Sequence, residues 1–218
     1  MMYTAKRREI LDICRLVYDR NLTNAAGSNF SARASEDTLY VSINGNAKRN
    51  RLRMTADDLL LSTLDGKVLE GEGKFSQSWP THLKMYQQFD FVGAVIHAHP
   101  RYATAFACRD VPMPPLLDAM KKYGEIPVLP RHLKVDSPEF GDAIVDIFRA
   151  KGDGFRKHGH GVLYPFHGVL VAAPNLDDAY DLLERIEYNA TAILSNILFD
   201  LGHYGSLIKD LHAVEVSE

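Results

Sequence analysis

The stretch Val92-Gly93-Ala94-Val95-Ile96-His97-Ala98-His99-Pro100 combines an apolar run with two closely spaced histidines. Its apolar part predicts a buried strand, and Pro100 marks the end because proline cannot donate to strand pairing. Residues i and i+2 of an extended chain point to the same side, so His97 and His99 should face a common point. Neutral imidazole is a good ligand for zinc and other first-row divalent ions. The stretch therefore predicts a strand that ends in the first two ligands of a metal site.

Helices and strands alternate on both sides of this stretch. Helices are predicted at residues 4–20, from Ser78 to about 88, from Ser137 onward and after Asn175, and strands at 39–43 and within 161–173 on both sides of 166–168. Residues 21–33 are predicted as a polar, glycine-containing loop. The last helix has the clearest apolar face, made by Ala179, Leu182, Leu183, Ile186, Ala190, Ile193, Leu194 and Ile197. Strands bounded by helices predict an α/β fold with helices on both faces of a sheet.

The composition excludes several classes of protein. The chain has 218 residues, 46% of them hydrophobic, and we expect one α/β domain over residues 1–218. With a net charge of -3 and no strongly basic half, nucleic acid is not an expected partner. Charges interrupt the N-terminal segment and no stretch approaches about 18 apolar residues, so neither a signal peptide nor a membrane span is expected. Two lone cysteines, Cys14 and Cys108, form no disulfide framework and favour a reducing, cytoplasmic location.

A third ligand must come from elsewhere in the chain, which contains nine histidines. His167 is the best candidate, because it stands between two apolar, strand-like runs where a polar side chain needs a buried partner. His158 and His160 form a rival pair, but they lie in a glycine-rich stretch that we interpret as a flexible loop. His82 is expected to be a packing residue or a neighbour of the site. The remaining histidines, His132, His203 and His212, follow no pattern.

Four stretches in this order resemble the class II aldolase/adducin family, especially members like L-fuculose-phosphate aldolase. They are Gly27-Ser28-Asn29-Phe30-Ser31-Ala32-Arg33, Trp79-Pro80-Thr81-His82-Leu83, Val95-Ile96-His97-Ala98-His99-Pro100 and His167-Gly168-Val169-Leu170-Val171. The resemblance covers roughly residues 5 to 195. It implies a three-layer α/β/α fold with a mainly antiparallel central sheet, and a homotetramer with its site at a subunit interface.

The resemblance also assigns roles to individual residues. It implies that His97, His99 and His167 bind a divalent metal, with Zn²⁺ expected. It implies that Asn29, Asn44, Gly45, Ser76 and Gln77 bind a substrate phosphate, and small polar residues and glycine are suited to wrapping phosphate oxygens. Each of these residues is also typical of an ordinary turn without a ligand, above all Asn44-Gly45. The basic run at 48–53 is interpreted as a solvated loop, with a clamp for an anionic substrate or a neighbouring subunit as the alternative.

One position departs from the family pattern. Aldolases of the family carry a glutamate, the general acid/base, just before the tryptophan that corresponds to Trp79, and here that position is Ser78. We expect Ser78 to be the N-cap of the following helix rather than a base. General acid/base catalysis contributes typically about 10² to 10⁴-fold, so its loss need not abolish metal-assisted chemistry. The candidate replacements are Glu70, Glu72, Asp118, Tyr123 and Tyr204, of which Asp118 is retained as a catalytic candidate.

These features predict a metal-dependent lyase that breaks a carbon–carbon bond in a small, phosphorylated hydroxy-ketone sugar. An epimerase, dehydratase or decarboxylase that uses the same metal site is the alternative that the missing glutamate favours. A non-catalytic, adducin-like scaffold is a third hypothesis, although a scaffold has no need of three converging imidazoles.

Overall fold

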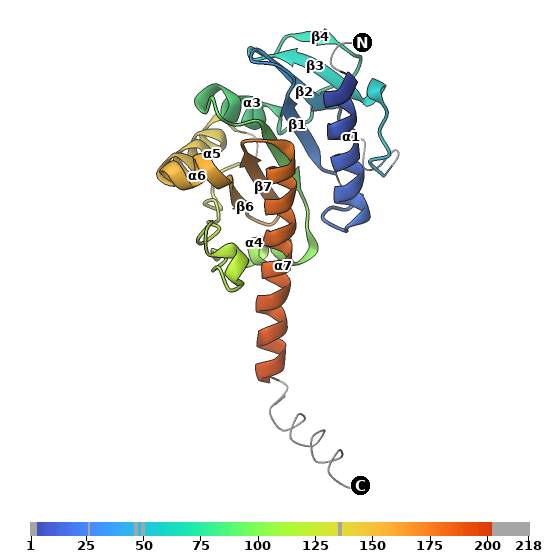
Figure 1. The fold of residues 1–218 in the computed structure, drawn as a ribbon. Coiled ribbons are helices and arrows are strands. Elements are labelled where there is room, and N and C mark those ends of the chain that lie inside the picture. Colours follow the sequence, from blue (N-terminus) through green and yellow to red (C-terminus); the bar gives the residue numbers. More distant parts are fainter. Residues whose placement is uncertain (1–3, 26, 46–47, 49–50, 135–136, 202–218) are drawn as a thin grey trace, which may run out of the picture.

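A seven-stranded sheet forms the middle of the molecule (Figure 1). The computed structural model describes residues 4–25, 27–45, 48, 51–134 and 137–201. The strands are β1 (Asn29–Arg33), β2 (Thr38–Ser42), β3 (Leu59–Thr63), β4 (Val68–Glu70), β5 (Ala94–Ala98), β6 (His160–Tyr164) and β7 (Gly168–Ala173). Their order across the sheet is β4-β3-β2-β1-β5-β7-β6, and every pair of neighbours is antiparallel.

Helices cover both faces of this sheet. The helices are α1 (Thr4–Asp19), α3 (Trp79–Gln88), α4 (Arg101–Arg109), α5 (Pro138–Ala150), α6 (Gly152–His158) and α7 (Leu176–Leu201), with short 3-10 turns η1 (Ala56–Asp58) and η2 (Asp118–Met120). Helices α1, α4 and α7 share one apolar cluster with the sheet, and α3, α5 and α6 share the other. The predicted three-layer α/β/α fold with an antiparallel central sheet is confirmed.

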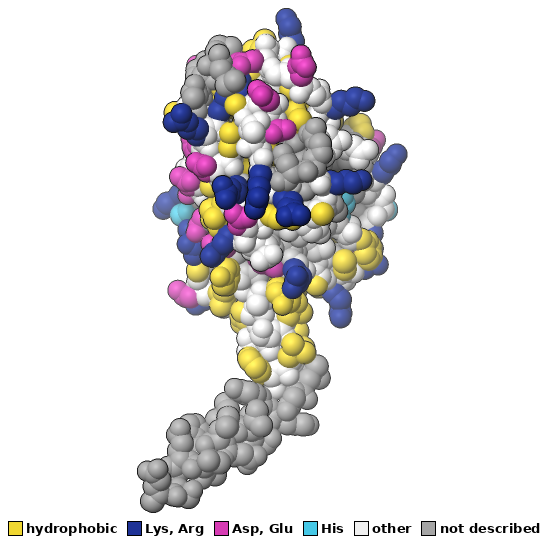
Figure 2. Space-filling view, turned by 90° about the vertical axis from the view of Figure 1, so that its right-hand side faces the viewer, with side chains coloured by type: hydrophobic (Ala, Val, Ile, Leu, Met, Phe, Trp, Pro, Cys, Tyr) yellow, Lys and Arg dark blue, Asp and Glu magenta, His cyan; other side chains and the backbone are white. Residues whose placement is uncertain are grey.

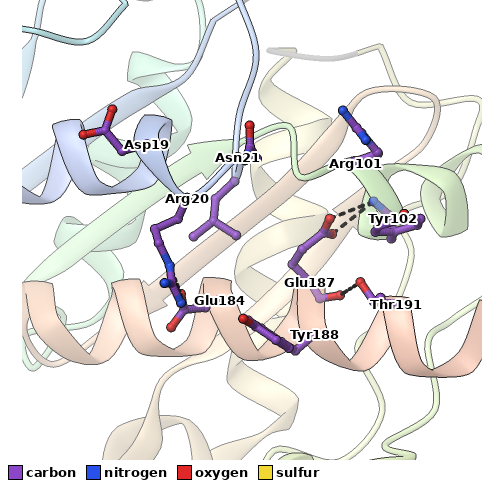
Figure 3. Close-up of a pocket in the computed structure, with 10 residues that line it drawn as sticks. Asp19, Arg20, Asn21, Arg101, Tyr102, Glu184, Glu187, Tyr188 and Thr191 are labelled. Carbon is purple, nitrogen blue, oxygen red and sulfur yellow. Dashed lines mark hydrogen bonds and ion pairs between the residues drawn. The ribbon is translucent and has the colours of Figure 1, made fainter.

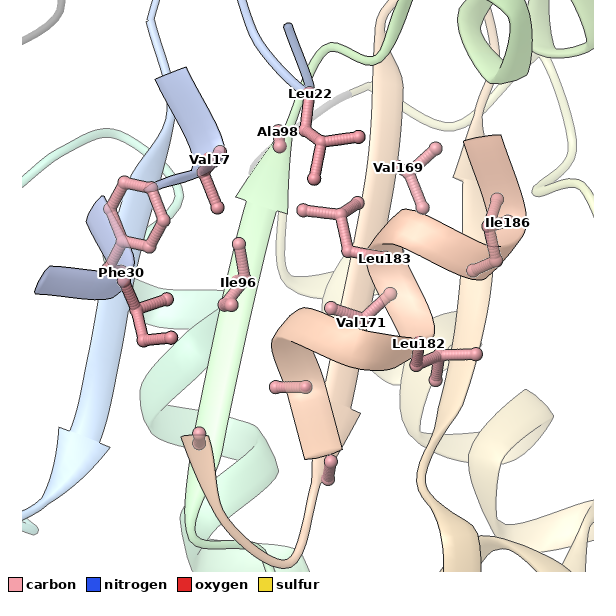
Figure 4. Packing of buried hydrophobic residues seen from close by; sticks show 14 of the residues in the cluster. Val17, Leu22, Phe30, Ile96, Ala98, Val169, Val171, Leu182, Leu183 and Ile186 are labelled. Atoms are coloured by element: carbon pink, nitrogen blue, oxygen red, sulfur yellow. The ribbon is translucent and has the colours of Figure 1, made fainter. Parts of the chain in front are cut away.

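The two central strands β5 and β7 are buried on both faces, which explains their uninterrupted apolar sequences. Ile96 of β5 and Val169 and Val171 of β7 point toward α7, where Leu182, Leu183 and Ile186 cover them (Figure 4). Val95 belongs to the apolar cluster of the opposite face. Because side chains alternate along a strand, His97 lies on that second face, which α3 covers.

Helix α7 confirms the predicted apolar face over most of its length. Ala179, Leu182, Leu183, Ile186 and Ala190 are fully buried, and Ile193 and Leu194 pack against the same cluster. The prediction is wrong at Ile197, which is 47% exposed, because the helix runs past the sheet and has nothing to cover there (Figure 1). Figure 2 shows hydrophobic side chains on this projecting part, and Leu198 and Phe199 are among the exposed apolar residues.

The predicted loop at 21–33 is wrong in its second half, where β1 forms. The strand alternates apolar residues, buried Phe30 and partly buried Ala32, with polar ones that hydrogen-bond on the opposite face. Ser31 Oγ lies 2.8 Å from His82 Nδ1, and Arg33 Nε donates to the Val92 carbonyl at 2.8 Å. The polar residues of this segment made it look like a loop, although they hydrogen-bond within the fold and form part of a strand. None of the helices among the described residues combines the length and apolar character needed to span a membrane.

The rival histidine pair is separated by the fold. His158 ends α6 and His160 begins β6, so the predicted flexible loop is wrong. The ring of His160 is 1% exposed and lies 5.9 Å from that of Phe148. Burial, together with nearby Lys151, lowers the pKa of His160 to about 3. This histidine is therefore a neutral core residue.

The burial of His160 should make the fold acid-sensitive. The unfolded chain binds a proton as the pH falls through 6.5, whereas the folded imidazole resists protonation down to about pH 3. The unfolding free energy should therefore fall with decreasing pH in that window, by up to about 1.4 kcal/mol per pH unit. His160→Gln should reduce the loss between pH 6 and pH 5 by about 1 kcal/mol, measured by urea unfolding at both pH values. His158→Gln, at a less buried position, is the control and should change the loss less. A His160→Gln protein as acid-sensitive as the wild type would contradict this account.

Candidate functional site

Three histidines meet at one end of the central strands. His97 and His99 come from the end of β5, and His167 comes from the turn between β6 and β7. Their ring centroids are 4.9 Å apart in each pair, and one ligand nitrogen of each lies within 4.8 Å of the others. Within the described part of the chain, this is the one group of three or more metal-ligating side chains that comes so close together.

The orientation of His97 is fixed by a backbone carbonyl. Its Nδ1 donates to the carbonyl oxygen of Val169 at 2.9 Å, because a carbonyl can only accept. The proton on Nδ1 leaves the lone pair of Nε2 directed into the site. Nε2 of His167 lies 3.0 Å from this atom. Two nitrogens that bind one tetrahedral zinc ion are about 3.3 Å apart, so this spacing fits a shared metal ion.

Burial keeps these imidazoles in the form that binds metals. The pKa of His97 lies well below 6.5, first because the ring is buried and then because His99 and His167 lie close by. Burial, with His167 next to it, lowers the pKa of His99 to about 4. Both rings are therefore neutral near pH 7 with a free lone pair, and the donor set fits zinc or another first-row divalent ion.

Glycine at position 168 allows the turn to approach β5. A Cβ at Gly168 would lie 2.4 Å from the Ala98 carbonyl oxygen and 2.7 Å from Cδ2 of His99. Such distances are far below van der Waals contact, so any larger residue would push the turn away. The pattern of a histidine followed by glycine is thus explained by close packing between the turn and the strand end.

A cavity of about 170 Å³ opens beside the histidines. Its wall is formed by Gly27, Ser28, Asn29, Asn44, Gly45, Lys48, Ser76, Gln77, Ser78, His97, His99 and His167. All five residues predicted to bind phosphate are brought together here. Gly45 has a φ of 82°, which glycine adopts without strain, so the Asn44-Gly45 turn exists and also faces the cavity.

Two further residues of the wall add to the predicted set. Ser28 was not predicted, and its Oγ, like Oδ1 of Asn29, is buried without a hydrogen-bond partner in the described structure. Buried polar atoms normally have partners, so both are available to a ligand. Among the described residues, Lys48 is the one cationic side chain on the wall, which favours the clamp interpretation of the basic run for this residue. Arg49 and Asn50 of that run lie outside the described residues.

The two catalytic candidates lie in different places. Ser78 is on the cavity wall and 6% exposed. It occupies the N-cap position of α3, but its hydroxyl makes no capping hydrogen bond because its backbone is already helical, with φ -77° and ψ -2°. The prediction of a side-chain cap is therefore wrong. Asp118 lies in η2 with 93% of its side chain exposed, pairs with Lys121 at 2.7 Å and does not line the cavity.

The other candidate bases that the structure describes also lie away from the cavity. Glu70 pairs with Arg7 at 2.9 Å, Glu72 is exposed, and Tyr123 is buried next to His158. Tyr204 lies outside the described residues, as do His203 and His212. No described carboxylate lines this cavity.

His82 is a buried residue that hydrogen-bonds within the fold. Its Nδ1 contacts Ser31 Oγ, which in turn lies 2.9 Å from the hydroxyl of Tyr86. Burial lowers the pKa of His82 to about 3, so the ring is neutral. The side chain belongs to the packing between α3 and β1, as predicted.

A larger hollow of about 500 Å³ lies elsewhere, between α1, α4 and α7 (Figure 3). Most of its charged groups already have partners within the fold. Arg20 pairs with Glu184 at 2.7 Å, and the carboxylate of Glu187 accepts from the backbone amides of Tyr102 and Ala103 at the start of α4. We therefore place the candidate site at the histidines and not at this larger hollow.

Known proteins resemble the chain over different lengths. The chain is 34% identical over 102 residues to L-fuculose phosphate aldolase of Methanococcus maripaludis, a match that spans 47% of the chain and 53% of that protein. It is 26% identical over 229 residues to 3,4-dihydroxyphthalate decarboxylase of Arthrobacter keyseri, which covers 100% of the chain and 87% of that protein. The first of these matches thus spans only about half of the relative's length.

Structure comparison agrees with the sequence matches. The fold superposes on an L-fuculose 1-phosphate aldolase with a TM-score of 0.78 and 25% identity, covering 91% of this chain and 89% of that one. The family model described as Class II Aldolase and Adducin N-terminal domain matches residues 8–194. Since this range is most of the chain, the protein belongs to the class II aldolase and adducin family.

Proposed function

We propose that the protein is a metal-dependent lyase that breaks a carbon–carbon bond in a small hydroxy-ketone carrying a phosphate. The observation that carries this proposal is the meeting of three imidazoles at one wall of a cavity whose other walls are polar. A bound divalent ion, with Zn²⁺ as the first choice, supplies Lewis-acid polarisation of a carbonyl and stabilises negative charge as it develops on the oxygen. The relatives named aldolases support this choice of reaction.

The chain's own residues would bind and orient the substrate. Lys48 is positioned to attract a phosphate, and the amide and hydroxyl groups of Asn29, Asn44, Ser76 and Gln77 to hydrogen-bond its oxygens. Binding energy from this remote group can then orient the reacting carbons next to the histidines. Ser28 would add a further hydroxyl, since its Oγ is buried and has no hydrogen-bond partner in the part of the chain that the structure describes.

Decarboxylation is the second candidate reaction, and the lack of a carboxylate on the cavity wall favours it. Aldol cleavage needs a base to take the proton of a hydroxyl group, and Ser78 cannot do so at neutral pH without help. Loss of CO₂ needs no such base, because the electron pair of the broken carbon–carbon bond stays on the remaining carbon, which then takes a proton from water. The full-length resemblance to a decarboxylase supports this alternative. An epimerase or dehydratase would also need a base, and no described carboxylate lines the cavity. The three histidines count against a scaffold.

The remaining proposals concern assembly and location. We propose one domain over residues 1–218 that forms a homotetramer in the cytoplasm, with neither nucleic acid nor membrane as a partner. The exposed apolar residues of α7, Ile197, Leu198 and Phe199, support the proposed assembly, because such side chains are usually covered in solution.

The proposed assembly can be measured directly. Light scattering at micromolar concentration should give a mass of roughly four times the 24.5 kDa of one chain. Leu198→Glu should lower that mass, because it places a charge on the apolar surface of α7. A clean monomer for the wild type would exclude the tetramer.

Metal content tests the histidine site. The purified protein should hold one divalent ion per chain, and His99→Ala should lose most of it, since two imidazoles bind zinc much more weakly than three. Elemental analysis and equilibrium dialysis against Zn²⁺ provide the measurement. His158→Ala is the control and should retain full stoichiometry. If the two variants behave the other way round, the wrong histidines have been assigned.

Position 78 distinguishes the two reactions. Metal-loaded protein should first be tested on a panel of ketose phosphates and of hydroxylated aromatic acids, with identification of the products. Ser78→Glu should raise retro-aldol activity on a ketose 1-phosphate by about tenfold or more, because it supplies the missing general acid/base. Ser78→Ala is the control and should leave that activity unchanged. If Ser78→Glu instead abolishes a robust decarboxylation, the site is built for loss of CO₂ and the aldolase proposal fails.

A further inference from the structure

His167 is the most exposed of the three candidate ligands. His97 is 2% exposed and His99 is partly buried, whereas His167 is exposed and lies in a turn. The turn runs from Tyr164 to His167, and the His167 amide donates to the Tyr164 carbonyl at 3.0 Å. An exposed side chain in a turn has many accessible rotamers, so something must keep this ring directed at the other two.

The residue before His167 has a strained backbone. Phe166 has a φ of 57°, the left-handed region, at the third position of a turn where glycine or asparagine is usual. For a bulky aromatic residue this conformation is an outlier, and such outliers persist only where the surroundings impose them. Phe166 is also 59% exposed, so burial of its ring does not explain the conformation.

Two contacts hold Phe166 in place, and a third holds the arginine that covers its ring. Its amide donates to the carbonyl of Ala107 in α4 at 3.3 Å. The guanidinium of Arg131 lies over its ring, 4.7 Å from the centroid. Nε of Arg131 pairs with Oδ2 of Asp110 at 2.6 Å. We call Phe166, Arg131 and Asp110 the turn clamp.

Helix α4 connects this clamp to His99. The helix begins at Arg101, two residues after His99, and ends at Arg109, next to Asp110 of the clamp. Ala103, Phe106 and Ala107 anchor it in the core. Helix α4 therefore links His99 to the turn clamp, which holds the turn that carries His167.

We propose that the turn clamp positions His167 as the third metal ligand, which makes Phe166 and Arg131 positioning residues of the site. The inference rests on the metal site of the proposed function. The clamp residues do not line the cavity, so they act through His167 and not on the substrate. Without the ring of Phe166 or its cover by Arg131, the turn can relax from its left-handed conformation and carry His167 away from His97.

Metal affinity tests the clamp without any assay of activity. Phe166→Ala and Arg131→Ala should each weaken Zn²⁺ binding about tenfold or more in competition with a chromophoric chelator, as is typical when the residues that orient a ligand are lost. Phe166→Tyr keeps a ring under Arg131 and should retain wild-type affinity. In the Co²⁺-substituted protein, the absorption spectrum of both alanine variants should shift, because the ion loses an imidazole.

A matched control exists near the start of β5, at the other end of the strand from the histidines. Arg156 also lies over an aromatic ring, 4.5 Å from the centroid of Phe91, and pairs with Asp90 at 3.4 Å. Arg156→Ala removes the same kind of contact far from the histidines and should leave both the Zn²⁺ affinity and the Co²⁺ spectrum unchanged. Thermal melts followed by circular dichroism verify that every variant is folded.

The outcomes separate the clamp from the metal site. Wild-type protein that binds Zn²⁺ while Phe166→Ala and Arg131→Ala keep the same affinity would overturn the clamp and leave the metal site standing. Arg156→Ala weakening Zn²⁺ binding as much as Arg131→Ala would also overturn it, since the effect would then be general. Wild-type protein that takes up no Zn²⁺ or Co²⁺ would overturn the metal site and the clamp with it.

Discussion

The antiparallel pairing of β5 with β7 is the contact on which the rest of the structure depends. His97 lies opposite Leu170 and Ala98 opposite Val169, so the end of one central strand meets the start of the other. Apolar side chains on both faces of this pair bind the two helical layers. The same register brings the turn before β7 against the end of β5, where only Gly168 fits. One strand pair thus organises the core and also delivers the histidines to a common point.

The site is built from groups that the fold leaves unsatisfied. The imidazoles of His97 and His99 are kept neutral by burial, and polar atoms of Ser28 and Asn29 have no hydrogen-bond partner among the described residues. Such groups reduce the stability of the folded chain unless a ligand binds them. Their concentration around one cavity is what a binding site requires, because a ligand then gains interactions that the protein does not already make.

Local sequence determined most of the secondary structure near the site. The apolar run at 92–96, the spacing of His97 and His99 and the long periodic face of α7 each depend on neighbours along the chain, so period and proline placement were sufficient to predict them. The order of the seven strands could not be read from periodicity, and the structure supplies it; resemblance to the family implied only that the central sheet is mainly antiparallel. The Ser137 cap of α5 was also predictable, and its hydroxyl accepts from the Phe140 amide at 3.2 Å.

Only the tertiary structure decided which distant residues meet. His167 is 70 positions from His97, and their 3.0 Å approach depends on the strand pairing and on the absence of a side chain at Gly168. The sequence around Ser78 predicts a helix cap, yet in the fold its backbone is helical and its side chain lies on the cavity wall. The glycine-rich stretch around His160 predicts a flexible loop, but the side chain lies in the core. Sequence patterns report contacts between residues one turn or one pleat apart, whereas these positions are set by packing between segments that are far apart along the chain.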